Sequence, residues 1–81
     1  MPGRLRRLSG SELIRAFEHL GFGVHAQKGS HIKLRRIRDG QTQTLVLPNH
    51  RDIDKGTILA IYRQASRFVT AEELHPIFYT D

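Results

Sequence analysis

The chain has 81 residues, of which 38% are hydrophobic, with four Phe, two Tyr and no Trp; this predicts one small folded core. Its net charge is +5, and because it contains no Cys, disulfides, thiolate nucleophiles and thiolate metal ligands are excluded. No apolar run approaches the roughly 20 residues that a membrane helix requires. We expect a monomeric cytoplasmic protein forming one domain over residues 1–81, with a core of about 8–66 and a tail over 67–81.

The first predicted element is a helix that begins after Ser9. Ser9 and Glu12 have the spacing of a capping box, in which each side chain bonds a backbone N–H at the helix start. Apolar residues then recur with a helical period, at Leu13, Ile14, Phe17 and Leu20. Gly21 follows where a left-handed C-terminal cap is common, so the helix is expected to end there.

From Phe22 onward the hydrophobic period changes to two, which predicts strands. In the first strand, every second residue from Phe22 to Ala26 is expected to face inward, whereas His25 faces outward, where it could neighbour His31. A later strand over residues 42–47 is rich in Thr and follows an Asp-Gly turn signal. With the intervening segment, these elements predict a half-buried antiparallel meander of three strands.

The middle strand carries the positive charge of the chain. Residues 28–38 contain five basic side chains and no carboxylate, so the remaining residues balance eight bases against eight acids. Alternation sends Ile32 and Leu34 inward, while Arg36 falls on the inward parity with its guanidinium expected at the rim. The residues left on the outward face are His31, Lys33 and Arg35. A focused positive patch attracts polyanions, chiefly nucleic acid, but also an anionic membrane surface or an acidic protein.

Two more helices are expected after the strands. Asp54 can cap a helix whose apolar stripe consists of Ile58, Ile61, Tyr62 and Ala65. Thr70 and Glu73 repeat the capping-box spacing, but Pro76 limits a third helix to one or two turns. Because one face of the sheet is apolar, both main helices are expected to cover that face. The predicted class is therefore α+β, with an αβββα order and a short C-terminal helical turn.

The chain contains LSGSELIRAFEHLGF, QKGSHIKL and LPNHRDIDKGTILAIYRQA, in this order, between Leu8 and Ala65. In their order and spacing these stretches resemble the HicA toxins of toxin–antitoxin pairs. The resemblance implies a double-stranded-RNA-binding-like αβββα fold, in agreement with the element order derived above. It also implies a toxin that cleaves mRNA and is neutralised by a HicB-type antitoxin. The family's functional histidine corresponds to His31, and its Gly-Ser lead-in corresponds to Gly29 and Ser30.

His31 has the chemistry to support RNA cleavage without a metal or other cofactor. RNA carries its own nucleophile, the 2′-hydroxyl, so the protein need only move protons and stabilise negative charge. Imidazole can serve as acid or base near neutral pH, and either role is open. We predict an endoribonuclease, an mRNA interferase of the stress response, with His31 as its catalytic residue and 2′,3′-cyclic phosphate ends as its products. The predicted RNA-binding residues are Lys28, Gly29, Ser30, Lys33 and Arg35.

Two other functions remain open at this point. A non-catalytic RNA-binding module of the same fold would bind through shape and phosphate contacts without cutting. A docking protein would use the basic face for an acidic partner. His31 discriminates the first of these from the nuclease, because a binding module would not depend on it for function. His50 lies in a loop with Asp52 and Asp54, where such residues are ordinary capping and turn chemistry, so no metal site is expected.

Overall fold

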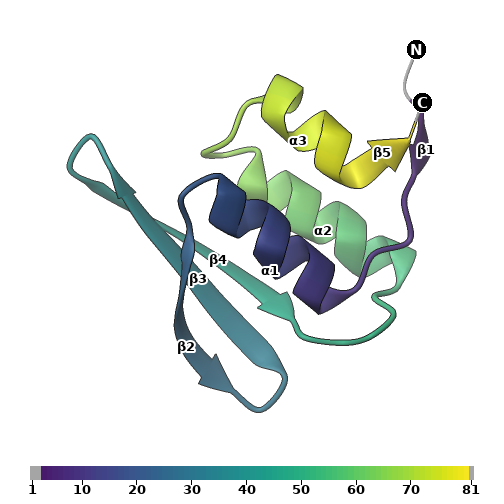
Figure 1. Ribbon diagram of the computed structural model, residues 1–81, viewed down its shortest axis with the longest axis horizontal. Helices are drawn as coiled ribbons and strands as arrows, with labels where there is room; N and C mark the ends of the chain where they lie inside the picture. The colour runs from purple at the N-terminus through teal and green to yellow at the C-terminus, as the bar shows by residue number, and fades with distance from the viewer. Residues whose placement is uncertain (1–2, 81) are drawn as a thin grey trace.

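A computed structural model describes residues 3–80, in which helices cover one face of a three-stranded sheet (Figure 1). The elements are β1 (Arg4–Leu5), α1 (Gly10–His19), β2 (Gly23–Lys28), β3 (His31–Arg38), β4 (Gln41–Pro48), α2 (Lys55–Ala65), α3 (Ala71–Phe78) and β5 (Tyr79–Thr80). The predicted α+β class and the αβββα order of its central elements are confirmed. In Figure 1, α1 and α2 lie between the three-stranded sheet and α3.

α1 begins at the predicted capping box. The Ser9 hydroxyl accepts from the backbone N–H of Glu12 at 3.1 Å, and the Glu12 carboxylate accepts from the N–H of Ser9 at 2.9 Å. These two bonds satisfy donors that an uncapped helix would leave without partners. Leu13 and Phe17 on the apolar stripe are 0% exposed. The helix is therefore fixed at its start by local bonds and along its length by burial.

β3 and β4 form the regular part of the sheet. Asp39 and Gly40 both have positive φ, 53° and 76°, as a two-residue type I′ hairpin turn requires. From this turn the strands pair without interruption to His31 opposite Pro48. The side chains that face the helices are buried, namely Ile32, Leu34, Leu45 and Leu47. One face of these two strands is covered and the other is open, as predicted.

β2 differs from the prediction, because each of its residues is exposed. The pairing with β3 shifts between Val24 and Ala26, so Val24 lies opposite Leu34 but Ala26 lies opposite Lys33. A β-bulge inserts one unpaired residue and reverses the facing of every residue beyond it. Ala26 thus faces outward rather than inward, and the expectation of a half-buried strand is wrong. His25 lies at the bulge rather than opposite His31.

The C-terminal segment belongs to the core. α3 has eight residues, which is about two turns as predicted, and it continues past Pro76 to Phe78. Leu74 and Phe78 are 0% exposed. The Phe78 ring lies 6.2 Å from the Phe17 ring of α1 and 5.1 Å from the Tyr62 ring of α2, measured between centroids. α3 therefore packs against both main helices.

A two-stranded ribbon joins the two ends of the described chain, and the sequence pattern did not predict it. β1 pairs with β5 in antiparallel register, with Arg4 opposite Thr80 and Leu5 opposite Tyr79. Arg6 extends this contact, because its backbone N–H donates to the carbonyl of Phe78 at 2.7 Å. Figure 1 shows the ribbon beside α3.

None of the helices formed by residues 3–80 is both long enough and apolar enough to cross a membrane.

Candidate nucleic-acid interface

The open face of the sheet presents His31 between two neighbouring strands. His31 is exposed and begins β3, where it pairs with Lys28 of β2 and with Pro48 of β4. Residues directly opposite each other in antiparallel strands have Cβ atoms about 4.5–5.5 Å apart and share a face. The structure therefore places the side chains of Lys28 and His31 on the same face of the sheet, beginning at neighbouring positions.

Lys33 and Arg35 continue this face along β3, and both are exposed as predicted. Lys33 lies between Ala26 and Val46 in the pairing, and Arg35 lies opposite Thr44. The sequences of β2, β3 and β4 contain no Asp or Glu, so no carboxylate on these strands offsets their cations. The name basic face is used here for Lys28, His31, Lys33 and Arg35. Its three cations lie on the same face of the sheet and suit the binding of phosphate.

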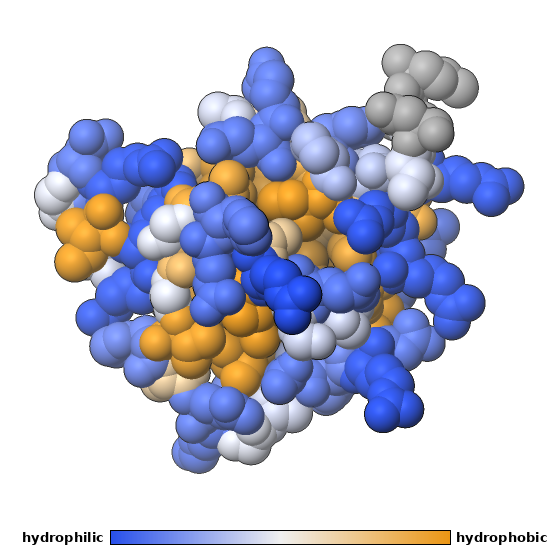
Figure 2. Space-filling view, in the orientation of Figure 1, coloured by the Kyte–Doolittle hydropathy of each residue, from blue (hydrophilic) through white to orange (hydrophobic). Residues whose placement is uncertain are grey.

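The basic face also has an apolar component. Val46 is 42% exposed and lies opposite Lys33, and Ile37 is 71% exposed at the far end of β3. Such side chains can contact sugar and base surfaces between phosphates. Figure 2, in the orientation of Figure 1, shows apolar patches separated by hydrophilic residues.

Gly29 and Ser30 form the turn that leads into His31. Gly29 has a φ of +59°, which favours glycine, and a Cβ built there would meet no atom within 4 Å. The turn therefore projects into open space on the glycine side. Ser30 is half-buried and its backbone carbonyl accepts from the N–H of Asn49 at 2.6 Å. The predicted residues Lys28, Gly29, Ser30 and His31 are thus brought together in one hairpin.

His50 is a residue of this site that sequence reasoning missed. Its Nε2 atom lies 3.2 Å from the hydroxyl oxygen of Ser30, within hydrogen-bond distance. The sequence contained a clue to this contact. A two-residue turn at Asp39 and Gly40 implies the pairing of His31 with Pro48. That pairing places the residues after Pro48 beside the turn that precedes His31.

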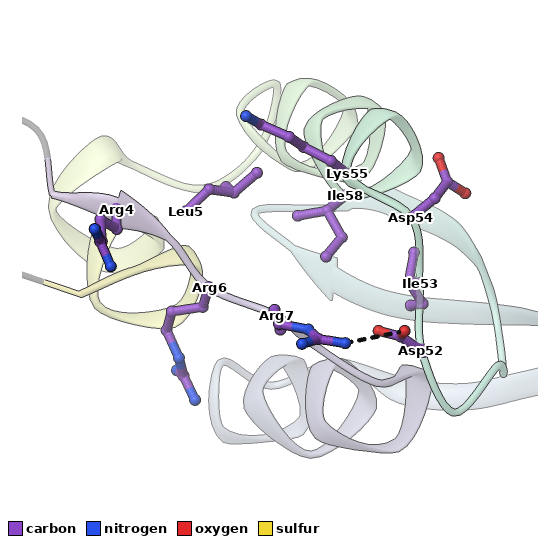
Figure 3. Close-up of a pocket in the computed structure, with 9 residues that line it drawn as sticks. All are labelled: Arg4, Leu5, Arg6, Arg7, Asp52, Ile53, Asp54, Lys55 and Ile58. Atoms are coloured by element: carbon purple, nitrogen blue, oxygen red, sulfur yellow. Dashed lines mark hydrogen bonds and ion pairs between the residues drawn. The ribbon is translucent and has the colours of Figure 1, made fainter.

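The loop that carries His50 is attached to the N-terminal segment (Figure 3). Asp52 forms an ion pair with Arg7, in which the guanidinium donates to the carboxylate at 3.4 Å. In addition, the backbone N–H of Ile53 donates to the carbonyl of Leu8 at 3.1 Å. Both partners of the ion pair are largely exposed, so it contributes little energy, whereas Ile53 is buried and anchors the loop. A groove of about 680 Å³ separates β1 from the start of α2. Its lining contains none of the residues of the basic face.

Asp54 ends this loop and caps α2. Its carboxylate accepts from the Thr57 hydroxyl at 2.7 Å and from the Thr57 backbone N–H at 3.0 Å. These hydrogen bonds hold the pKa of Asp54 below its ordinary value, since they stabilise the charged form. The carboxylate thus accepts hydrogen bonds from the first turn of α2. Within residues 3–80, no group of three or more His, Cys, Asp or Glu side chains could hold a metal ion.

Arg36 faces inward as its parity predicted, but the expectation that its guanidinium reaches the rim is wrong. The residue is 5% exposed. Its guanidinium donates to Gln43 Oε1 at 2.5 Å, to the Leu20 carbonyl at 2.7 Å and to the Phe68 carbonyl at 3.1 Å. Burial lowers its pKa from the ordinary value. This cation is held by neutral acceptors inside the protein and is not part of the basic face.

Comparison with known proteins gives one family. Neither curated proteins nor solved structures provide a significant match to the chain. The model of the HicA toxins of bacterial toxin–antitoxin systems matches residues 10–66, which include α1, the three-stranded sheet and α2. The matched part thus contains the basic face, its Gly-Ser turn and the loop with His50. The chain belongs to the HicA family, the toxins of bacterial toxin–antitoxin pairs.

Proposed function

We propose that this toxin is a metal-independent endoribonuclease that cleaves mRNA at the basic face, with His31 as general acid or base. The observation that carries the proposal is the pairing that places exposed His31 beside Lys28 on an open sheet face without strand carboxylates. A group that transfers protons and a group that neutralises phosphate are adjacent there. Cleavage of mRNA would inhibit translation, and this substrate places the toxin in the cytoplasm.

The chemistry uses a nucleophile that the substrate already contains. The RNA 2′-hydroxyl attacks the adjacent phosphorus, a new P–O bond forms, and the bond to the 5′-oxygen breaks. One proton leaves the 2′-oxygen and one reaches the 5′-oxygen, giving a 2′,3′-cyclic phosphate and a 5′-hydroxyl. His31 in its neutral form accepts the first proton, or in its charged form donates the second. No metal is needed to generate the nucleophile.

The predicted RNA-binding residues have distinct roles in this proposal. Lys28, Lys33 and Arg35 hold phosphate groups and stabilise the negative charge that grows in the transition state. Gly29 lets the RNA backbone approach the turn, since no side chain projects there. Ser30 offers a hydroxyl beside the reacting phosphate.

The first prediction concerns His31. Purified wild-type protein should cleave a long unstructured RNA in the presence of EDTA, and His31→Ala should lower the rate by at least about 100-fold, because general acid–base catalysis contributes about that factor or more. RNA affinity should change little, since the cations remain. Gel analysis with identification of the product ends is the measurement. His25→Ala is the matched control, because it removes another exposed histidine from the same sheet.

Full activity of His31→Ala would refute the catalytic role. RNA that is bound but left intact by the wild-type protein would instead favour the non-catalytic RNA-binding module. Cleavage that requires added divalent metal would refute the metal-independent mechanism.

The second prediction concerns a HicB-type antitoxin, which we propose neutralises the toxin by covering the basic face with carboxylates. Lys33→Glu combined with Arg35→Glu should weaken antitoxin binding at least about tenfold, because like charges would then oppose each other. Calorimetric titration measures this affinity. Arg15→Glu, on the exposed surface of α1, is the control with the same kind of charge change. An antitoxin complex that still cleaves RNA at the full rate would contradict the proposal.

A further inference from the structure

His50 contacts the residue immediately before His31, although the two belong to different segments. The His50 Nε2 atom and the Ser30 hydroxyl oxygen are 3.2 Å apart and come from positions 20 residues apart in the chain. A hydroxyl donates to a neutral imidazole nitrogen and accepts from a protonated one, so the bond can form in either state. The side chain of His50, in the loop after β4, thus forms a hydrogen bond with the turn before β3.

The backbone around His50 is held from two directions. The N–H of Asn49 donates to the carbonyl of Ser30 at 2.6 Å, and the N–H of Gly10 donates to the carbonyl of His50 at 2.8 Å. α1 begins so close to this loop that a Cβ at Gly10 would lie 2.5 Å from the carbonyl oxygen of Pro48. The backbone that carries the His50 imidazole is therefore held in a defined position.

The turn that His50 contacts has few other restraints. Lys28 is exposed, and a side chain at Gly29 would touch nothing within 4 Å. Within the hairpin, Gln27 Nε2 donates to the Gly29 carbonyl at 3.1 Å, but this bond is exposed to water. Besides the strand pairing of His31, contacts from Asn49 and His50 connect the turn to the loop after β4.

We propose that His50 is a positioning residue of the basic face, which holds the turn through Ser30 so that His31 and Lys28 keep a fixed geometry toward phosphate. This inference rests on the proposed ribonuclease function and deepens it. His50 acts through Ser30, and the proton transfers stay with His31. A small displacement of a catalytic group is costly, since about 1 Å can reduce a rate about 100-fold.

The kinetic test uses His50→Ala, His50→Gln, Ser30→Ala and the double Ala variant. Under single-turnover conditions at saturating RNA, each Ala variant should cleave about 10- to 100-fold more slowly than wild type. The double variant should be no slower than the slower single variant, because both remove the same bond. His50→Gln should retain activity, since its amide can also bond a hydroxyl. His19→Ala, an exposed histidine on α1, is the control and should match wild type.

A His50→Gln variant as slow as His50→Ala would overturn the positioning role, because that result means that the imidazole itself is required. Effects that multiply in the double variant would also overturn it, since the two side chains would then act separately.

A second measurement does not depend on RNA cleavage. The backbone N–H of Asn49 bonds the turn directly, so its hydrogen exchange, followed by NMR, reports whether the turn stays attached. His50→Ala should accelerate exchange of this amide by about five- to tenfold relative to wild type, and His50→Gln should not. The amide of Leu34, in the centre of the sheet, is the internal control.

Unchanged exchange at Asn49 in His50→Ala would overturn the inference even if the protein cleaves RNA. Accelerated exchange in a protein whose wild type does not cleave RNA would support the attachment by His50 and refute the ribonuclease proposal. The two failures are therefore distinguishable.

Discussion

Arg36 is a buried residue that forms hydrogen bonds with three separate segments of the chain. Its guanidinium donates to the end of α1 at Leu20, to the segment after α2 at Phe68 and to Gln43 of β4. It also lies over the Phe22 ring, with its central carbon 4.6 Å from the ring centroid. A buried charge is tolerated when every donor has a partner, and a planar fork can reach several acceptors at once. Arg36 therefore joins three segments that are distant in sequence.

Arg36→Met should lower the free energy of unfolding by about 3–5 kcal/mol, because it leaves one buried and two partly buried acceptors without a donor. Arg36→Lys should also destabilise the protein, since one ammonium group cannot reach the same three acceptors. Urea unfolding followed by circular dichroism measures both changes. Arg35→Met is the control on the open face of the same strand and should change stability by less than about 0.5 kcal/mol. An Arg36→Lys variant as stable as wild type would contradict this account.

The helices of this protein begin at side-chain caps, and the carboxylates at two of these helix starts make stability depend on pH. Hydrogen bonds from Thr57 hold the pKa of Asp54 low, and those from Ser9 do the same for Glu12. A carboxyl group whose pKa is lower in the folded than in the unfolded protein stabilises the fold above its unfolded pKa, about 4 for Asp. That contribution is lost as the pH falls through the folded pKa.

Asp54→Asn should remove this dependence at one helix while keeping a good N-cap residue. At pH 6 the wild-type protein should have the higher Tm, because the charged carboxylate bonds Thr57 and favours the helix N-terminus. The difference should shrink as the pH falls below about 4, where Asp54 of the unfolded chain becomes protonated, and it should vanish once the pH falls below the lower pKa of the folded protein. Thermal unfolding of both proteins between pH 2.5 and pH 6 provides the measurement. A Tm difference that stays constant over this range would exclude a role for Asp54 ionisation.

At the scale of the whole molecule, the helices and the C-terminal segment build the core on one side of the sheet, and the basic face occupies the other. Val69, Leu74 and Phe78 are nearly or fully buried and belong to the same cluster as Phe17 of α1 and Ile61 of α2. The family match ends at residue 66, before these three residues. We propose that residues 1–81 fold as one unit in which segment 67–81 completes the core.

A chain that ends at residue 66 should therefore lose cooperative folding. Burial of the three apolar side chains contributes about 2 kcal/mol each, which is comparable with the whole stability of a domain this size. Circular dichroism during heating should show no cooperative transition, and a peptide of residues 67–81 added in trans should restore one. A truncated chain that melts cooperatively at the wild-type Tm would contradict the proposal.

Sequence patterns predicted the elements whose cause is local. Ser9 with Glu12 predicted the start of α1, and the Asp-Gly pair predicted a turn that sets the pairing of β3 with β4. Alternation in β3 placed His31, Lys33 and Arg35 on the exposed face. These predictions succeeded because capping bonds, turn angles and side-chain period depend on residues a few positions apart.

Other features depend on contacts between segments that are distant in sequence, and these became visible only in the folded protein. The bulge in β2 reversed the facing of Ala26, the β1–β5 ribbon joined the ends, and the guanidinium of Arg36 found acceptors in three segments. The bond between His50 and Ser30 exists only because the β4 strand returns beside the turn before His31. No local pattern encodes such contacts, since each requires the packing of the whole sheet and its helices to be in place.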